Sequence, residues 1–386
     1  MRNAIVAMVL CACCALQAQE TLVAAAPAGA APQADAAKPL IQMAILLDTS
    51  SSMDGLIDQA RGQLWKVVNE FITATRAGKK PELQVALYEY GKPTLGAESG
   101  YIRQIVPFTT DLDKVSQELF ALKTNGGDEY CGWVIKTACE QLAWSKAAND
   151  LKVIFICGNE PFTQGPVDYR VSCKNAIARG IIVNTIHCGP WDQGIAEKWQ
   201  DGALLTDGKY SCIEQDKTVV HVDAPQDKEL ATLNEKLNAT YVSLNTAEGK
   251  KAKDNQLAQD GNASKMSAES FSSRAASKAS AYYQNGTWDL VDALKNNPKA
   301  LEEAKPEELP AEMQKLTPDE RKEYVAAKQK ERAEIQQQIL KLNAERGKFV
   351  SEELKKRGDS KDDSLDKVMG KAVREQAEKK SFEFNK

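Results

Sequence analysis

Histidine is almost missing from this sequence, which has only His187 and His221 among its 386 residues. His187 is followed by Cys188, but neighbouring residues of a strand point to opposite faces, so the two do not form a thiol–imidazole pair. Cys/His spacing of the zinc type and the Gly-Lys-Ser/Thr ending of a phosphate loop are both absent. With no acid/base pair to replace these groups, we predict that the protein is not an enzyme.

A strong net charge is also lacking: 50 Lys and Arg stand against 54 Asp and Glu, a balance of −4, so no nucleic-acid partner is expected. No stretch after the first residues is apolar for long enough to span a bilayer. Residues 1–18 combine one Arg, an apolar run and small residues, as a secretory signal does. We therefore predict an exported protein, periplasmic or associated with the cell surface. "LCAC" leaves lipidation of Cys13 open as an alternative to a cleaved soluble form.

The changes in composition along the chain predict five segments. They are a signal peptide at 1–18, an Ala/Pro-rich linker at 19–39, a strand–helix domain at 40–245, a weakly structured linker at 246–284, and a charged helical region at 285–386. Alternating strands and helices predict an α/β fold in which a doubly wound, mostly parallel sheet is flanked by helices.

The charged region contains one strong helix start, Thr317-Pro318-Asp319-Glu320, with a hydroxyl cap, a Pro in the first turn and a carboxylate three positions after the cap. Arg332 and Arg346 interrupt the apolar stripe that follows, which argues against a long coiled coil. A helical hairpin packed on itself or on the first domain is favoured over a solvated charged tail.

Hydroxyls and one acid follow the apolar strand in "AILLDTSSSM", residues 44–53. In an open parallel sheet, ligands bind beyond the carboxyl ends of the strands. Asp48, Ser50 and Ser52 supply three oxygen-bearing side chains from one loop, which suits a hard cation such as Mg²⁺, with Mn²⁺ or Ca²⁺ as substitutes. A turn with a helix cap is the alternative use of the same residues.

"ILLDTSSSM" resembles the first motif of the von Willebrand factor A domain, and the similarity extends over about residues 40–245. The resemblance implies that family's fold and its metal-ion-dependent adhesion site (MIDAS). Alignment of "TNGGDEYCG" puts Asp128 where the family has a metal-binding Thr, with Thr124 as an alternative oxygen. Alignment of "IFICGNEPF" puts Cys157 where the family has an Asp. One carboxylate is thus lost and another gained across the same cleft.

Six cysteines follow the three in the signal, an even number that permits disulfides in an exported protein. Cys157 and Cys188 end two strands expected to be neighbours, and Cys131 begins a helix beside the same rim. A bridge from Cys157 to Cys131 or to Cys188 would stiffen this rim, and buried free thiols are the alternative.

Two functions agree with these observations. The first is an exported binding module that engages a protein ligand through its altered metal site. The second is a structural or scaffold protein with a degenerate metal site, which interacts through its C-terminal helices.

Overall fold

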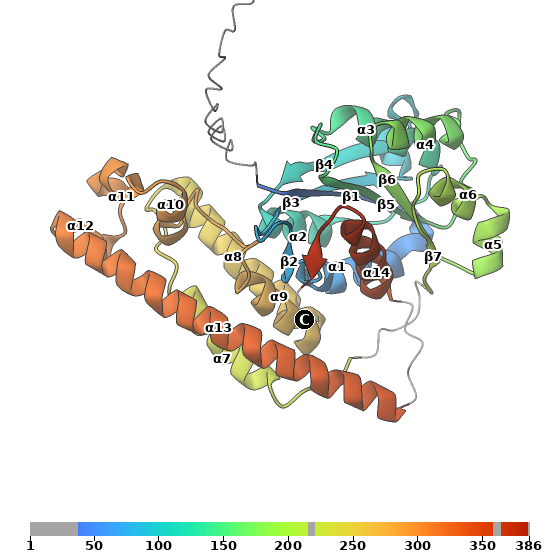
Figure 1. The fold of residues 1–386 in the computed structure, drawn as a ribbon. Coiled ribbons are helices and arrows are strands. Elements are labelled where there is room, and N and C mark those ends of the chain that lie inside the picture. Colours follow the sequence, from blue (N-terminus) through green and yellow to red (C-terminus); the bar gives the residue numbers. More distant parts are fainter. Residues whose placement is uncertain (1–37, 215–220, 358–363, 385–386) are drawn as a thin grey trace, which may run out of the picture. The chain divides into compact units, whose positions relative to one another are not determined.

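The computed structural model describes residues 38–214, 221–357 and 364–384. The predicted signal peptide at 1–18 and residues 19–37 of the linker predicted at 19–39 lie outside these ranges. The chain folds around a six-stranded sheet in the order β4-β3-β1-β5-β6-β7, in which only the edge strand β4 is antiparallel to its neighbour (Figure 1). The strands are β1 (Leu40–Asp48), β3 (Glu82–Tyr90), β4 (Ile102–Thr109), β5 (Leu151–Gly158), β6 (Ile182–His187) and β7 (Tyr210–Cys212). The predicted mostly parallel sheet is therefore confirmed.

Strand β1 lies at the centre because both of its faces are apolar. Met43 and Ile45 point into one core and Ala44 and Leu46 into the other, as a parallel strand covered on both sides requires. Helices α1 (Asp54–Asn69), α2 (Leu112–Ala121) and α14 (Leu365–Glu378) cover the first face. Helices α3 (Cys131–Gln141), α4 (Tyr169–Ala178) and α6 (Trp199–Leu204) cover the second face.

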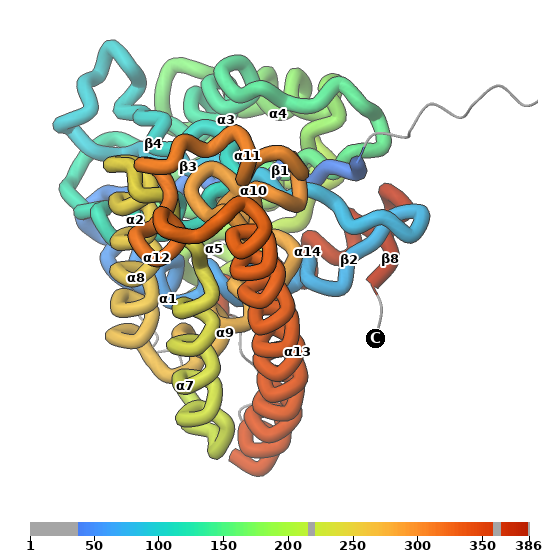
Figure 2. Tube along the Cα trace, turned by 90° about the vertical axis from the view of Figure 1, so that its left-hand side faces the viewer, coloured from blue at the N-terminus to red at the C-terminus, as the bar shows by residue number. Residues whose placement is uncertain are grey.

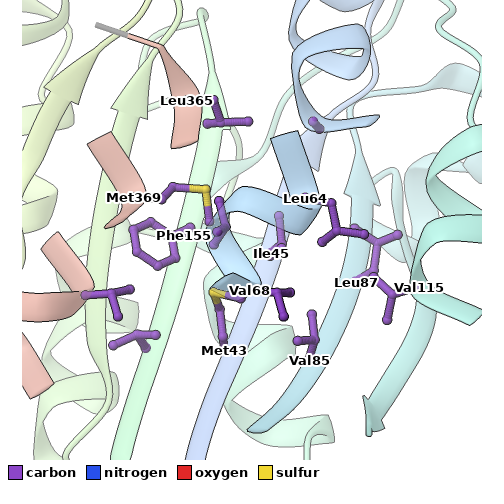
Figure 3. Packing of buried hydrophobic residues seen from close by; sticks show 14 of the residues in the cluster. Met43, Ile45, Leu64, Val68, Val85, Leu87, Val115, Phe155, Leu365 and Met369 are labelled. Carbon is purple, nitrogen blue, oxygen red and sulfur yellow. The ribbon is translucent and has the colours of Figure 1, made fainter. Parts of the chain in front are cut away.

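Helix α14 reaches this core from the far end of the sequence. Met369 lies beside Phe155, and Leu365 and Met43 belong to the same core (Figure 3). After α14, strand β8 (Glu383–Phe384) pairs antiparallel with β2 (Ala74–Thr75), which follows α1. The sheet domain is thus discontinuous and consists of residues 38–214 together with 364–384. The C-terminal helical region predicted at 285–386 is confirmed, but its last part, α14 with β8, packs as part of the sheet domain.

The intervening residues form a helical region, Asp227–Arg357. Its longer helices are α7 (Asp227–Asn238), α8 (Ala247–Met266), α9 (Ala268–Lys278), α10 (Leu290–Asn296) and α13 (Pro318–Arg357), and of these α8 and α9 pack against α1 and α2 of the sheet domain. Its shorter ones are α11 (Ala300–Glu303), η4 (Pro306–Glu308) and α12 (Ala311–Gln314). Helix α13 is continuous over 40 residues and lies beside α7 and α9 (Figure 2), so it is neither a hairpin nor a solvated tail. It begins at Pro318, and Thr317 and Glu320 bond to each other as the predicted cap.

The expectation of a weakly structured linker over 246–284 is wrong, because α8 and α9 occupy most of it. These helices bury charged and amide groups rather than an apolar stripe. Arg274 Nε lies 2.5 Å from Asp260 Oδ1, and Lys278 Nζ lies 2.9 Å from Asp260 Oδ2. Arg274 Nη1 also pairs with Asp113 Oδ1 of α2 at 2.6 Å, which joins the helical region to the sheet domain.

Gln376 tests how firmly α14 is held. Its amide exchanges two hydrogen bonds with the buried side chain of Asn184 in β6, at 2.6 and 3.0 Å. Gln376→Ala leaves Asn184 without these partners, so we expect the free energy of unfolding in urea to fall by roughly 1–3 kcal/mol. Glu378→Ala, at an exposed position of the same helix, is the control. Equal stability of the two variants would contradict the prediction.

Candidate functional site

The candidate site lies where β1 ends, next to the point at which the chain stops adding strands on one side of β1 and starts on the other. The carboxylate of Asp48 is fully buried there. Its Oδ1 accepts a hydrogen bond of 2.7 Å from the Ser50 amide, and its Oδ2 is buried without any partner. The pKa of Asp48 is raised to about 7, mainly by burial and in smaller part by the nearby Glu160 carboxylate, against the lowering effect of hydrogen bonds from Ser50 and from the Asn159 amide. A buried carboxylate oxygen with no donor is a feature that a bound cation would satisfy.

The two serine hydroxyls face each other, with 3.2 Å between Ser50 Oγ and Ser52 Oγ. Asn159, which follows β5, donates from Nδ2 to Ser52 Oγ at 3.2 Å. Ser50 stands at the N-cap of the 3₁₀ turn η1 (Ser51–Met53), but its hydroxyl makes no capping bond, and α1 also begins without a side-chain cap. The hydroxyls therefore do not serve as the helix caps that the alternative interpretation required.

The acid that faces this loop is Glu129, which sequence reasoning missed. Its side chain is buried, and its backbone amide donates to Gln164 Oε1 at 2.8 Å. Burial raises the pKa of Glu129 to about 8, with further upward contributions from Asp48, Glu160 and Asp128, while the Ser50 hydroxyl lowers it.

Gly91 shows how closely Asp48 and Glu129 converge. A Cβ atom at this glycine, whose φ is +89°, would lie 2.8 Å from Asp48 Oδ1 and 3.0 Å from Glu129 Cγ. Both acids thus border the same small space, and any side chain at position 91 would fill it. The glycine was visible in the sequence, but this proximity depends on the fold.

The structure does not place the side chains of Asp128 and Thr124 at the space that Asp48 and Glu129 border. Asp128 is exposed, and Tyr130 Oη donates to its Oδ2 at 3.5 Å. The Thr124 hydroxyl donates to Asp54 in the first turn of α1. Their predicted ligand roles stay predictions, and Glu129 becomes the competing candidate.

The predicted disulfide is not formed, since the thiols of Cys131, Cys157 and Cys188 are all free. Cys157 packs in the core on the α1 face of the sheet and Cys131 in the core on the α3 face, so the sheet separates them. Burial raises the pKa of Cys157 and of Cys188 and keeps both as neutral thiols. A neutral buried thiol is a poor ligand for a hard cation.

The candidate site thus contains only two converging carboxylates, those of Asp48 and Glu129, within the part of the chain that the structure describes. Within the described ranges, no three His, Cys, Asp or Glu side chains come close enough together to hold a metal ion. Any cation bound here would need the serine hydroxyls as well as Asp48 and Glu129, a combination of oxygens that Mg²⁺ accepts together with water.

The model of the von Willebrand factor type A domain matches residues 42–200. No curated protein matches the sequence.

The fold resembles proximal thread matrix protein 1 from the mussel byssus at 12% identity and a TM-score of 0.35, over 46% of this chain and 43% of that protein. It also resembles BatB from Bacteroides thetaiotaomicron, with 14% identity, a TM-score of 0.35, and 45% and 90% of the two chains covered. The SpRpn10 VWA domain is similar at 16% identity and a TM-score of 0.35, over 47% of this chain and 100% of that domain. The match of the family model identifies residues 42–200 of this chain as a von Willebrand factor type A domain.

Proposed function

We propose that this chain is an exported protein-binding module that engages a protein ligand through a divalent cation at the end of β1. The unpartnered, buried Oδ2 of Asp48 carries the proposal. Asp48, Ser50, Ser52 and Glu129 would hold the ion, and the ion would offer an open coordination position to an acidic group of the partner. Domains of this family are typically interaction modules rather than enzymes.

The residues of this chain supply the conditions for such a site. Asp48 and Glu129 are buried away from bulk water. Their attraction for a cation is therefore stronger than it would be on an open surface. Ser50 and Ser52 add neutral oxygens, so the total negative charge stays low. Asn159 orients Ser52.

Export to the periplasm or the cell surface remains part of the proposal, since the segment that would direct it lies outside the described residues. None of the helices in the described ranges is both long and apolar enough to cross a bilayer.

Titration calorimetry of residues 38–386 with Mg²⁺ and Mn²⁺ tests the site and discriminates between its two candidate acids. We expect Glu129→Gln to weaken binding by at least roughly tenfold, a loss that even an outer-shell substitution can produce. Asp128→Asn removes the same charge one residue earlier, at an exposed position, and is the matched comparison.

A loss in Asp128→Asn alone would instead support the ligand set inferred from the sequence. Absence of binding to the parent protein would refute the ion site and favour the scaffold role of the helical region.

A further inference from the structure

Glu89, the penultimate residue of β3, is buried but does not border the proposed ion site. Its side chain has no exposure to solvent, and its carboxylate is ion-paired with Lys92, at 2.7 Å from Nζ to Oε2, and with Arg103. The Thr49 hydroxyl lies 3.2 Å from the same Oε2 and 3.1 Å from the Tyr90 carbonyl oxygen, and these two acceptors share its one proton. A buried carboxylate between two cations costs desolvation free energy, so its position invites a functional explanation.

Thr49, the residue that Glu89 contacts, stands between Asp48 and Ser50 and joins three segments. Its amide donates to the Tyr90 carbonyl at the end of β3, at 2.8 Å. Its own carbonyl accepts from the amide of Asn125 at 2.9 Å. Thr49 therefore connects the end of β1, the end of β3 and the loop that leads to Glu129.

Lys92 reinforces the same connection. While paired with Glu89, its Nζ also donates to the Lys123 carbonyl at 3.0 Å, just before the loop that carries Glu129. Glu89 thus acts on this loop by two routes, through Thr49 to Asn125 and through Lys92 to Lys123.

We infer that Glu89 is a positioning residue for the ion site: by fixing Thr49 and Lys92, it sets the distance between Asp48 and Glu129. The inference rests on the proposed ion site. A carboxylate suits this position because one of its oxygens faces both Thr49 and Lys92 while the other faces Arg103. An amide in its place would present an N–H group to one of these donors.

Mn²⁺ titration of five proteins tests the inference: the parent, Glu89→Gln, Thr49→Val, Thr49→Ser and Glu140→Gln. We expect Glu89→Gln and Thr49→Val to bind Mn²⁺ at least roughly tenfold more weakly than the parent. Thr49→Ser keeps the hydroxyl and should restore most of the affinity. Glu140→Gln loses a carboxylate from a largely exposed pair with Lys136 and should bind like the parent. Parent-like affinity in both Glu89→Gln and Thr49→Val would overturn the inference.

Hydrogen exchange without any ion provides a second measurement, which decides the inference even if the parent fails to bind Mn²⁺ and the proposed function falls. Glu89→Gln should speed amide exchange across residues 44–53 and 122–130 and leave α13 unchanged. Unchanged exchange in those two segments would overturn the inference. Faster exchange throughout the protein would overturn it as well, because it would indicate a general loss of stability instead of a local loosening.

Discussion

Replacing Asp48 by asparagine should abolish divalent-ion binding and, at the same time, make the ion-free protein more stable at pH 8. The pKa of Asp48 is raised to about 7 by burial, so its ionised form is costly in the folded chain. Removing that charge should raise the free energy of unfolding by roughly 2–4 kcal/mol at pH 8. The parent should regain about 2.7 kcal/mol at an ion concentration 100 times its dissociation constant, and the variant should gain nothing.

The pH dependence follows from the direction of the two shifts. Asp48 and Glu129, with pKa values raised to about 7 and about 8, bind protons in the folded chain that the unfolded chain has already released. The free energy of unfolding of the ion-free parent therefore falls as the pH rises from about 4 to about 8. Asp48→Asn should flatten this fall. Ion affinity should change in the opposite sense and increase up to about pH 8, because the cation competes with these protons.

Urea unfolding at several pH values, with and without Mg²⁺, measures both effects. Asp58→Asn, at an exposed position on α1, is the control and should stay within about 0.5 kcal/mol of the parent. A destabilised Asp48→Asn protein at pH 8, or a difference from the parent that does not depend on pH, would contradict the prediction.

Arg274→Met should destabilise the protein by roughly 3–5 kcal/mol, the usual effect of removing one partner from a buried ion pair. Arg274 is almost fully buried over the Trp65 ring and pairs with Asp113 of the sheet domain and Asp260 of the helical region. Without it, the Asp113 carboxylate keeps the hydrogen bond from the Tyr283 hydroxyl but loses its paired cation, and Asp260, the second acid that Arg274 bridges, remains nearby in the interior. Urea unfolding monitored by circular dichroism measures the loss.

Lys136→Met removes a cation from a largely exposed pair with Glu140 and provides the comparison. This change should stay within about 1 kcal/mol of the parent. If Arg274→Met were no more harmful than Lys136→Met, the buried network would not be what holds the helical region to the sheet domain.

The sheet was predictable because its signals are local. The continuous apolar run that ends at Asp48, followed by an amphipathic stretch, indicates a buried strand and a covering helix, and both are present. The position of α14 was not predictable in the same way. Its apolar residues show only that it must pack somewhere, and the choice of the sheet depends on side chains some 300 residues earlier, such as Gln63, whose Oε1 accepts from the Asp366 amide.

The helical region was misread because its interior is partly ionic. Arg332 looked like an interruption of the apolar stripe, yet it is buried and pairs with Asp289 at 2.7 Å and with Asp292 at 3.1 Å. Charge compensation of this kind joins residues far apart in the sequence, and hydrophobic periodicity cannot detect it.

The candidate site was likewise predictable only where its residues belong to one loop. Asp48, Ser50 and Ser52 belong to one loop, so their proximity follows from their spacing alone. Which of Asp128 and Glu129 turns inward depends on the conformation of the loop before α3, where the Glu129 amide donates to Gln164 of another loop. No recognisable sequence pattern around Gln164 and Gly165 indicates this contact with Glu129.

The discontinuity of the sheet domain has a consequence for how the protein is made. Ribosomal synthesis delivers β1, β5 and α1 long before residues 365–384, so the part of this face that α14 covers, beside Phe155, stays uncovered while the helical region is being translated. Native contacts that span such sequence distances slow folding and prolong the exposure of apolar surface. A nascent chain that stalls within α13 would thus expose apolar surface of the sheet. Chaperones or proteases could distinguish it from the folded protein by that surface.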